Sequence, residues 1–395
     1  MQIHMHALQH AATMQLRPAA HPGGRFAAPQ QQMEHRAAAP QRQRRRLLAA
    51  PMRAAAPAAG IEAVVGLRPE IDAAVEQALS ACLTDTDLNM GKKYTGKVRD
   101  TYDVGDKLVI VTTDRQSAFD RLLAAVPFKG QVLNQTSAWW MQQTGHIVQN
   151  ALLAVPDANA CIMKKCSVFP VEFVCRGFLT GSTETSLWTH YSSGARQYCG
   201  NDFPDGMRKN QRLAQNVITP TTKAADHDVP ISPADIVAQG LMSQADWDAV
   251  SAAALQLFAF GQEQAAQRGL LLVDTKYEFG RDDSGSILLV DEIHTPDSSR
   301  YWLADSYEQR HAAGQEPQNI DKEFLRLWFR ANCDPYKDEV LPEAPAELRA
   351  ELSRRYVLLY EKITGQQFQP APLGEDPAQR MRKNVAAALQ ELGHA

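Results

Sequence analysis

Charged side chains interrupt an apolar stretch of the sequence at LLLVDTKYEFG, residues 270–280. Side chains alternate between the two faces of a β-strand, so Asp274, Lys276 and Glu278 would share one face. The opposite face would carry Val273, Thr275, Tyr277 and Phe279. Two acids and a base on one face of a largely apolar strand indicate either a binding site for charged groups or an ion-pair cluster that serves only the fold.

The next apolar strand along the chain leads directly into Asp291 and Glu292. One register of the resulting hairpin sets Asp291 beside Lys276 and Glu278. Two neighbouring carboxylates are hard oxygen ligands of the kind that bind Mg²⁺ together with phosphate, and a lysine between them would neutralise phosphate charge. The alternatives are a structural ion-pair cluster and the solvated face of a hairpin. The loop TPDSSR, which ends in Arg300, suits an oxyanion and favours a binding site.

The segment GKVRDTYDVGD, residues 96–106, combines glycine with basic side chains. Its alternation and the pair Gly105–Asp106 predict a β-hairpin with a two-residue turn. Gly96, Lys97 and Arg99 would lay backbone amides and cations over nucleotide phosphates, although the GxxxxGK[ST] spacing of a phosphate-binding loop is absent. An exposed hairpin without a ligand is the alternative interpretation.

Two further segments carry groups suited to anions. RGFLTGS places Arg176 and Ser182 on either side of a turn, which suits a phosphate or a carboxylate. TDRQSAFDR supplies Asp114, Arg115, Ser117 and Asp120. An Asp–Arg pair of this kind is also typical of a surface salt bridge, so this segment alone does not decide between the two.

Hydrophobic periodicity and capping signals predict the elements that must position these groups. The clearest helix lies in residues 241–269, where Ser243 and Asp246 form a capping box and Gly269 closes the C-terminus. The other predicted elements are helices over residues 61–82, 129–145, 345–362 and 376–392 and a strand over residues 165–182. Strands dominate the first half and mix with helices in the second, which predicts an α+β fold with a cleft between two domains.

The composition is that of an ordinary globular chain, with 395 residues, 44% hydrophobic and 22% charged. No apolar run is long enough to cross a membrane as a helix. The six cysteines form no CxxC pair, and we expect them to be reduced thiols.

The first 60 residues differ sharply in charge from the rest. They contain eight arginines, no lysine and one acid, Glu34, which gives a charge of +7. The whole chain carries −4, so residues 61–395 carry about −11. An arginine-rich, acid-poor leader is typical of an organelle transit peptide, although this one lacks the usual serine. A disordered basic tail that binds nucleic acid is the alternative, but the acidic remainder offers no basic face to cooperate with it. Cleavage is expected between Arg46 and Ala59.

Six ordered segments resemble those of one family, phosphoribosylaminoimidazole-succinocarboxamide synthase, also called SAICAR synthetase. The segments are GKVRDTYDVGDKLVIVTTDRQSAFDR, PFKGQVLNQTSAWW, FPVEFVCRGFLTGS, TPTTKAADHDVPIS, LVDTKYEFG and DEIHTPDSSRYW, within roughly residues 91–330. The resemblance implies two α+β lobes with the nucleotide between them, similar to ATP-grasp and kinase-like proteins. The details look like the plant and algal form, which implies a plastid transit peptide and the chloroplast stroma, with the mitochondrion as the alternative.

The resemblance also implies a reaction, that of an ATP-dependent carbon–nitrogen ligase of purine biosynthesis. The substrates would be ATP, L-aspartate and carboxyaminoimidazole ribonucleotide (CAIR), and the products SAICAR, ADP and phosphate. A carboxylate is a poor electrophile for an amine, so phosphoryl transfer would first create an acyl phosphate with a good leaving group. Mg²⁺ is implied as a cofactor. Neither nucleic acid nor a membrane is expected as a partner, and the choice between monomer and homo-oligomer stays open.

By resemblance, the family's site residues map onto this chain. The catalytic residues would be Lys276, Glu278 and Asp291, with Glu278 and Asp291 also holding the metal. The nucleotide contacts would be Gly96, Lys97, Arg99, Glu172, Lys223 and Lys276. The contacts to CAIR and aspartate would be Asp114, Arg115, Ser117, Asp120, Arg176, Ser182, Asp297, Arg300, Asp321 and Lys322. Within that set, Arg176, Ser182 and Arg300 would cradle the phosphate of the ribonucleotide.

The predicted organisation has three parts: a disordered transit peptide in residues 1–60, a mostly β lobe with the nucleotide hairpin in residues 61–170, and an α+β lobe with the metal and substrate site in residues 171–395. A kinase-like phosphotransferase and a non-catalytic nucleotide-binding module are the alternative functions. The first lacks support because neither HRDxxxxN nor DFG occurs. The second would be expected to lack at least one carboxylate or cation of the site, and none is missing.

Overall fold

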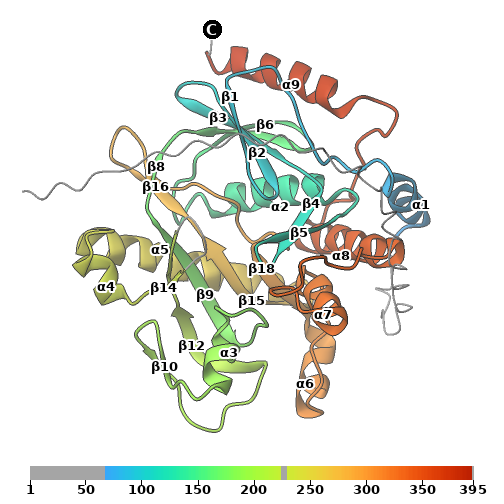
Figure 1. The fold of residues 1–395 in the computed structure, drawn as a ribbon. Helices are drawn as coiled ribbons and strands as arrows, with labels where there is room; N and C mark the ends of the chain where they lie inside the picture. The colour runs from blue at the N-terminus through green and yellow to red at the C-terminus, as the bar shows by residue number, and fades with distance from the viewer. Residues whose placement is uncertain (1–66, 224–228, 394–395) are drawn as a thin grey trace, which may run out of the picture. The chain divides into compact units, whose positions relative to one another are not determined.

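A computed structural model describes residues 67–223 and 229–393, so the predicted transit peptide lies outside the described residues. The helices are α1 (Pro69–Ala78), α2 (Lys129–Thr144), α3 (Leu187–Ser192), α4 (Pro233–Ala238), α5 (Gln244–Ala266), α6 (Ala304–Ala312), α7 (Glu323–Asn332), α8 (Ala346–Thr364) and α9 (Pro377–Glu391). Figure 1 shows them around two main sheets. The mixture of helices and antiparallel strands agrees with the predicted α+β class.

The strands fall into several antiparallel groups. The first ten are β1 (Lys92–Thr95), β2 (Arg99–Asp103), β3 (Lys107–Thr112), β4 (Arg115–Ala118), β5 (Arg121–Ala125), β6 (Leu152–Asp157), β7 (Ala160–Lys164), β8 (Ser167–Val168), β9 (Val171–Leu179) and β10 (Gln197–Tyr198). The others are β11 (Asn201–Asp202), β12 (Gln211–Ile218), β13 (Thr221–Thr222), β14 (Val229–Pro230), β15 (Leu270–Tyr277), β16 (Phe279–Arg281), β17 (Ile287–Leu289) and β18 (Ser299–Leu303).

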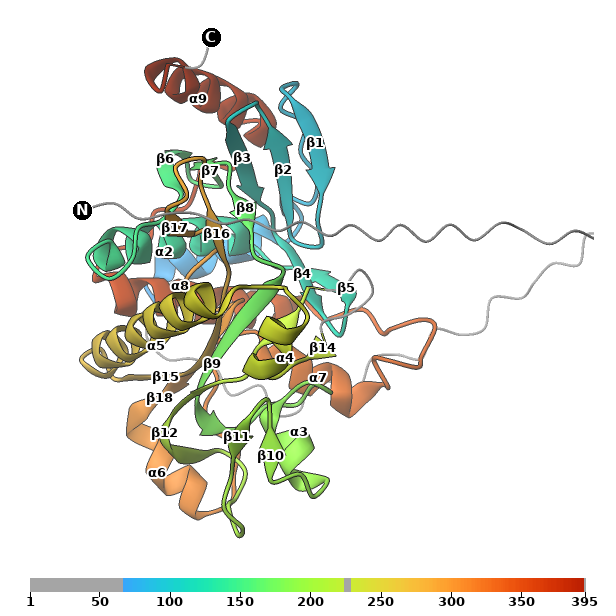
Figure 2. The same cartoon turned by 90° about the vertical axis from the view of Figure 1, so that its left-hand side faces the viewer.

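The first sheet carries the glycine-containing hairpin. Its strand order is β1-β2-β3-β7-β6 (Figure 2). β2 and β3 are joined through Gly105, whose φ of 90° confirms the turn predicted at Gly105–Asp106. β1 and β2 meet in a second tight turn, where the Gly96 N–H donates to the carbonyl of Arg99 at 2.8 Å. Lys97 therefore lies at the tip of a hairpin.

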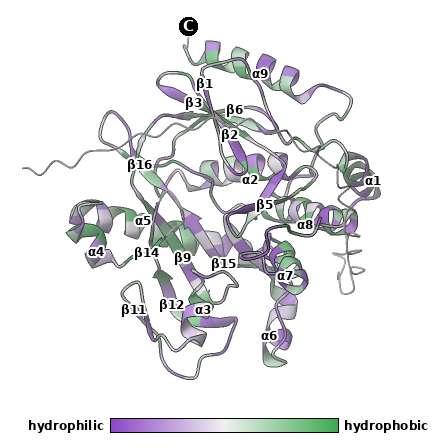
Figure 3. Ribbon diagram, in the orientation of Figure 1, coloured by the Kyte–Doolittle hydropathy of each residue, from purple (hydrophilic) through white to green (hydrophobic). Residues whose placement is uncertain are grey.

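The second sheet brings together the strands that carry the charged groups. Its order is β14-β13-β9-β15-β18, and β12 also pairs with β9. Eight of the nine residues of β9 are buried, and Figure 3 shows this strand mainly in hydrophobic colours. β15 pairs with β9 on one side and β18 on the other, so Asp274 lies directly between Arg176 and Arg300.

A bulge in β15 changes which of its side chains share a face. Between Leu272 and Asp274 the strand advances by two residues while β18 advances by one. Leu272 and Tyr277 therefore pack in one core cluster, whereas Val273 packs in another. The prediction that Val273 shares a face with Tyr277 is wrong, because the extra residue reverses the alternation. Asp274 and Lys276 nevertheless line the same cavity.

Helices cover the sheets and connect distant parts of the chain. α5 packs on β15, β9 and β12, and Ser243 Oγ accepts from the Asp246 N–H at 3.1 Å, as the capping box predicted. α8 packs against α1, α2 and α7. α9 returns to β6 and β7 of the first sheet, where it contributes Met381, Val385 and Leu389 to a core cluster. The proposed division into lobes near residue 170 stays a prediction.

Other local predictions can be placed on these elements. The helix predicted over residues 61–82 is observed as α1, and its residues 61–66 lie outside the described part. The strand predicted over residues 165–182 is split into β8 and β9 at Pro170, which has no N–H to donate to a sheet. All six cysteines are free thiols. None of the helices in residues 67–223 and 229–393 is long and apolar enough to span a bilayer.

Close packing of α2 on β3 leaves no room for a side chain at Gly130. A Cβ atom there would lie 2.2 Å from the Thr112 carbonyl oxygen. We expect Gly130→Ala to lower the free energy of unfolding by about 3 kcal/mol in urea denaturation, because backbone must move. Gly145→Ala, at the other end of α2, is the control, since the nearest atom to its Cβ would be 3.9 Å away. Equal stability of the two variants would contradict this packing.

Candidate active site

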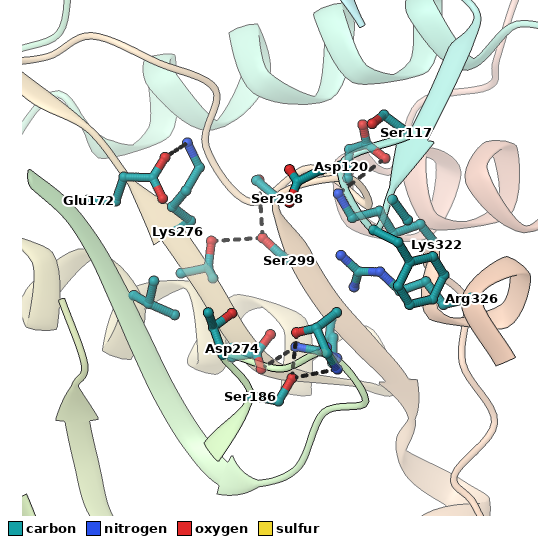
Figure 4. Close-up of a pocket in the computed structure, with 18 of the residues that line it drawn as sticks. Ser117, Asp120, Glu172, Ser186, Asp274, Lys276, Ser298, Ser299, Lys322 and Arg326 are labelled. Atoms are coloured by element: carbon teal, nitrogen blue, oxygen red, sulfur yellow. Dashed lines mark hydrogen bonds and ion pairs between the residues drawn. The ribbon is translucent and has the colours of Figure 1, made fainter. Parts of the chain in front are cut away.

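One cavity gathers side chains from both main sheets. Its volume is about 660 Å³. It is lined by the β1–β2 and β4–β5 hairpins, by β9 and β15, by the loop that enters β18 and by the start of α7. The predicted site residues in its lining are Lys97, Arg99, Ser117, Asp120, Glu172, Arg176, Lys276, Asp297, Arg300 and Lys322. Figure 4 shows Glu172 and Lys276 on one side of the view and Lys322 and Arg326 on the other.

The ammonium group of Lys276 lies among three carboxylates. Its Nζ is 3.1 Å from Glu172 Oε1 and 3.2 Å from Asp291 Oδ2, and it also pairs with Glu278. Lys223 pairs with Glu278 as well. The hairpin register considered from the sequence is therefore the one observed, since Asp291 and Glu278 both contact Lys276.

Arg99 joins the same cluster from the β1–β2 hairpin. Its guanidinium pairs with Asp291 and, at 3.2 Å, with Glu292. The cluster thus has four carboxylates and three cations, and it carries one net negative charge. Its members are Glu172, Glu278, Asp291 and Glu292 with Arg99, Lys223 and Lys276. Burial alone would raise the pKa of Asp291, but Arg99 and Lys276 hold it well below its usual value. Burial opposes the charge of Lys276, yet the carboxylates raise its pKa well above the usual value. Both groups stay charged.

A second charged cluster lies where β15 pairs with both of its neighbours. Arg300 Nη1 donates to Asp274 Oδ2 at 2.7 Å, and Arg176 Nη1 lies 3.6 Å from the same oxygen. Glu323 lies 3.2 Å from both Arg300 and Arg326. Three arginines thus face two carboxylates and carry one net positive charge. Burial lowers the pKa of Arg176 despite the nearby Asp274, so an added anion would stabilise its charged form.

Asp297 lines the cavity although its side chain is only 4% exposed. Gln116 Nε2 donates to Oδ1 at 2.9 Å, and Lys129 Nζ lies 3.1 Å from Oδ2. Burial alone would raise the pKa of Asp297, but Lys129 and Lys322 bring it below its usual value. Burial lowers the pKa of Lys322 to about 8. The charge of Lys322 therefore depends on any anion that binds beside it.

Lys97 and Asp120 face each other at the open edge of the cavity. They form an ion pair in which the side chains are 58% and 60% exposed. An exposed pair of this kind adds little stability, because water screens both charges. Lys97 can therefore exchange Asp120 for a charged ligand at little cost.

Several predicted residues support the cavity without lining it. Arg115 donates to the carbonyls of Gly96 and Lys97 at 3.0 and 3.2 Å and pairs with buried Asp100 at 2.7 Å. It therefore holds the turn of the β1–β2 hairpin. Glu278, Asp291 and Lys223 are also absent from the lining. Glu278 and Asp291 contact Lys276, and Asp291 also pairs with Arg99, whereas Lys223 pairs with Glu278.

Asp114, Asp321 and Ser182 likewise lie outside the lining. Asp114 accepts from the N–H groups of Gly130 and Leu83 at 2.9 and 2.7 Å, and burial raises its pKa to about 6. Asp321 accepts from the N–H group of Tyr301 in β18 and from that of Glu323 at the start of α7, both at 2.7 Å. Burial raises the pKa of Asp321 to about 7. Ser182 lines a neighbouring cavity of about 390 Å³.

Sequence reasoning missed several residues that line the cavity or contact a residue of its lining. Glu292 stands in the Asp–Glu doublet, and Lys129 lies in the segment PFKG, so both belonged to segments that had already been singled out. Arg326 had no such signal. The sequence does not distinguish it from Arg330 of the same helix, and only the packing of α7 places Arg326 at the cavity.

The carboxylate cluster has the donor chemistry that Mg²⁺ prefers. Glu172, Glu278 and Asp291 offer only oxygen ligands, and their cluster is net negative. Within the described part of the chain, no group of three or more His, Cys, Asp or Glu side chains is arranged to hold a metal ion. Mg²⁺ usually keeps several waters and binds one or two carboxylates together with phosphate oxygens.

Known proteins share this chain's sequence over most of the described region. The SAICAR synthetase family model matches residues 92–343. The phosphoribosylaminoimidazole-succinocarboxamide synthase of Legionella pneumophila (strain Lens) is 65% identical over 298 residues, which cover 74% of this chain and 96% of that protein. The chloroplastic protein of the same name from Arabidopsis thaliana is 60% identical over 328 residues, which cover 82% of this chain and 80% of that protein.

A solved structure is similar in fold as well as in sequence. It is the SAICAR-synthase from Saccharomyces cerevisiae complexed with SAICAR, which is 30% identical with a TM-score of 0.63. The match covers 73% of this chain and 99% of that one. The identities, the coverage and the common fold agree with the resemblance of the six sequence segments. The chain belongs to the SAICAR synthetase family.

Proposed function

We propose that this chain joins the amine of L-aspartate to the carboxylate of CAIR while ATP is converted to ADP and phosphate. As a family member, the chain is an ATP-dependent carbon–nitrogen ligase of purine biosynthesis. The names of its relatives and the SAICAR bound to the yeast protein support these substrates. The structural observation that carries the proposal is a single cavity with a net negative cluster around Lys276 and a net positive cluster around Arg300.

The two clusters suit two different phosphate groups. The arginine-rich cluster has an excess of positive charge, as a ribonucleotide phosphate requires, and arginine forks bind phosphate oxygens in pairs. Arg176 and Arg300 would hold this phosphate, with Ser182 close by. The carboxylate-rich cluster has an excess of negative charge and suits the nucleotide together with a cation. Lys97, Arg99, Lys223 and Lys276 would neutralise the ATP phosphates, and Glu172 would lie near the nucleotide.

Mg²⁺ is the cation that fits the carboxylate-rich cluster. Glu278 and Asp291 would hold the ion. Both contact the ammonium group of Lys276, so their carboxylates lie close together, and both offer oxygen ligands. When bound, the ion supplies positive charge to the phosphate oxygens of ATP. The protein's own residues orient the nucleotide from the hairpin side through Lys97 and Arg99 and from the sheet side through Lys276.

The chemistry proceeds in two steps. A carboxylate oxygen of CAIR attacks the γ-phosphorus of ATP, the bond to the bridging oxygen breaks, and ADP leaves. The aspartate nitrogen then attacks the acyl carbon, the carbon–oxygen bond to phosphate breaks, and the nitrogen loses a proton. The protein contributes mainly by positioning the groups and neutralising charge. Ser117, Asp120, Asp297 and Lys322 would contact CAIR and aspartate.

The remaining predicted residues are assigned as positioning residues because of their contacts. Arg115 would fix the turn that contains Gly96, and Asp114 would fix the start of α2. Asp321 would fix the chain between β18 and α7, from which Lys322 reaches the cavity.

The dependence of ADP release on both other substrates tests this function. Steady ADP production should require CAIR and L-aspartate together, and omission of either should stop turnover. Continued ADP production without aspartate would favour a kinase-like phosphotransferase. Binding of ATP without any turnover would favour a non-catalytic module.

Residues 1–60 are proposed to direct the chain to the plastid stroma. The support is their arginine-rich, acid-poor composition and the names of the relatives from Arabidopsis thaliana and Vigna aconitifolia, which are both chloroplastic. A fluorescent protein fused after residue 60 should accumulate in plastids of plant cells. Fluorescence confined to mitochondria or to the cytosol would contradict the assignment.

Replacement of Asp291 by asparagine tests the metal site. Asp291→Asn should lower kcat at least about 100-fold while the melting temperature changes little, because asparagine keeps the shape but removes a charge that holds the cation. The control is Asp283→Asn, which changes an exposed carboxylate in the turn between β16 and β17. Near-normal activity of Asp291→Asn at low Mg²⁺ would remove this residue from the site.

Steady-state kinetics can distinguish the two phosphate sites. Arg300→Lys should raise the KM for CAIR on the order of 10- to 150-fold, because a charge-assisted hydrogen bond contributes about 1.5–3 kcal/mol. Its KM for ATP should change much less. Lys97→Ala should show the opposite pattern. If Arg300→Lys raised the KM for ATP and spared that for CAIR, the two sites would be assigned the wrong way round.

A further inference from the structure

Four separate parts of the chain converge on the carboxylate of Asp297. Gln116 of β4 donates to Oδ1 at 2.9 Å, and the Tyr356 hydroxyl of α8 donates to the same oxygen at 3.2 Å. Lys129, the first residue of α2, approaches Oδ2 at 3.1 Å. Lys322, directly before α7, is more distant at 3.8 Å from Oδ1. So many contacts on one carboxylate fix both its position and its charge.

Lys129 differs from the other lysines near the cavity because the ligand cannot reach it. It is fully buried and does not line the cavity, whereas Lys322 does. Asp297 is its only ion-pair partner in residues 67–223 and 229–393. A buried ammonium without a partner would be strongly unfavourable, so Lys129 and Asp297 require each other. Lys129 neutralises Asp297 from within the protein and leaves the cavity side of the carboxylate to the substrates.

Tyr356 supports Asp297 from a helix outside the segment that matches the family model. α8 begins at Ala346, and the match ends at residue 343. The Tyr356 hydroxyl lies 3.2 Å from both Asp297 Oδ1 and Gln116 Oε1. The hydroxyl has only one proton to donate. Because an ionised carboxylate is a stronger acceptor than an amide oxygen, Asp297 receives this hydrogen bond. α8 is itself tied to the start of α2, since Ser353 Oγ donates to the Pro127 carbonyl at 2.7 Å.

We propose that Lys129 and Tyr356 are positioning residues that hold the Asp297 carboxylate as an anion, in one orientation, to accept a hydrogen bond from the amine of the incoming substrate. The inference rests on the proposed function, which places Asp297 at CAIR and aspartate. A protonated or rotated carboxylate could not accept that hydrogen bond, and the nitrogen would be held less well for its attack on the acyl carbon. α8 would thus be part of the active site.

Tyr356→Phe is the first test, because it removes one hydrogen bond and leaves every charge in place. It should lower kcat/KM for aspartate about tenfold. The acid limb of the pH profile of kcat/KM should also move to higher pH, since the carboxylate loses a donor that favours its ionised form. Tyr360→Phe is the matched control on the same helix, because its hydroxyl donates to Gln366 at 2.9 Å instead. Equal profiles for the two variants would overturn the role of Tyr356.

Lys129→Met is the second test, and it is combined with a double variant because loss of the closest cation of a buried carboxylate destabilises the fold. The single variant should move the acid limb upward by at least about one pH unit, because Asp297 loses its closest cation. Lys129→Met/Asp297→Asn removes both buried charges and should recover much of any lost melting temperature without recovering activity. A wild-type pH profile for Lys129→Met, or full activity of the double variant, would overturn the inference.

Asp297→Asn separates this inference from the proposed function. It should lower kcat/KM for aspartate at least about 100-fold, while ADP still binds with wild-type affinity by calorimetry. Wild-type turnover would mean that Asp297 is not at the substrates, and both proposals for this residue would fail. If Asp297→Asn were inactive while Tyr356→Phe and Lys129→Met behaved like the wild type, only the positioning role would fail.

Discussion

The contact of one partly buried ammonium group, that of Lys276, with three carboxylates is the interaction on which the rest of the site depends. Glu172 comes from β9, Glu278 follows β15, and Asp291 follows β17. Buried charges are tolerated only when they are closely paired. The three segments must therefore keep their places, because a shift of any one of them would leave carboxylates without a cation. The cluster in this way links β9, β15 and the segment after β17, and it is also the proposed place of the nucleotide.

The separation of a negative and a positive cluster in the cavity follows from the strand order. β15 lies between β9 and β18, so Asp274 meets Arg176 on one side and Arg300 on the other. Two residues further along the same strand, Lys276 meets the carboxylates. A single strand thus supplies a cation to the negative cluster and an anion to the positive cluster. The two proposed phosphate sites are therefore connected by one strand. A rigid connection of this kind can hold two substrates in a fixed relative position.

The sequence predicted local structure well where neighbouring residues decide it. Gly105 marked a turn, and Ser243 with Asp246 marked the start of α5, because a turn and a cap depend on a few consecutive residues. The face of Val273 was predicted wrongly. A bulge depends on how β15 pairs with β18, and the residues of β15 alone contain no sign of it. The family could be recognised because six segments occur in order, although no one of them is specific.

What the sequence by itself determined was the family, the reaction that it implies and the identity of most charged groups at the cavity. Only the tertiary structure decided which of them meet. Asp114 and Arg115 stand beside Ser117 in the sequence, yet they support the backbone while Ser117 lines the cavity. Tyr356 and Gln116 lie 240 residues apart and converge with Asp297. The physical reason is that helix and turn signals act over a few residues, whereas a buried carboxylate takes its partners from whatever segments the packed core brings beside it.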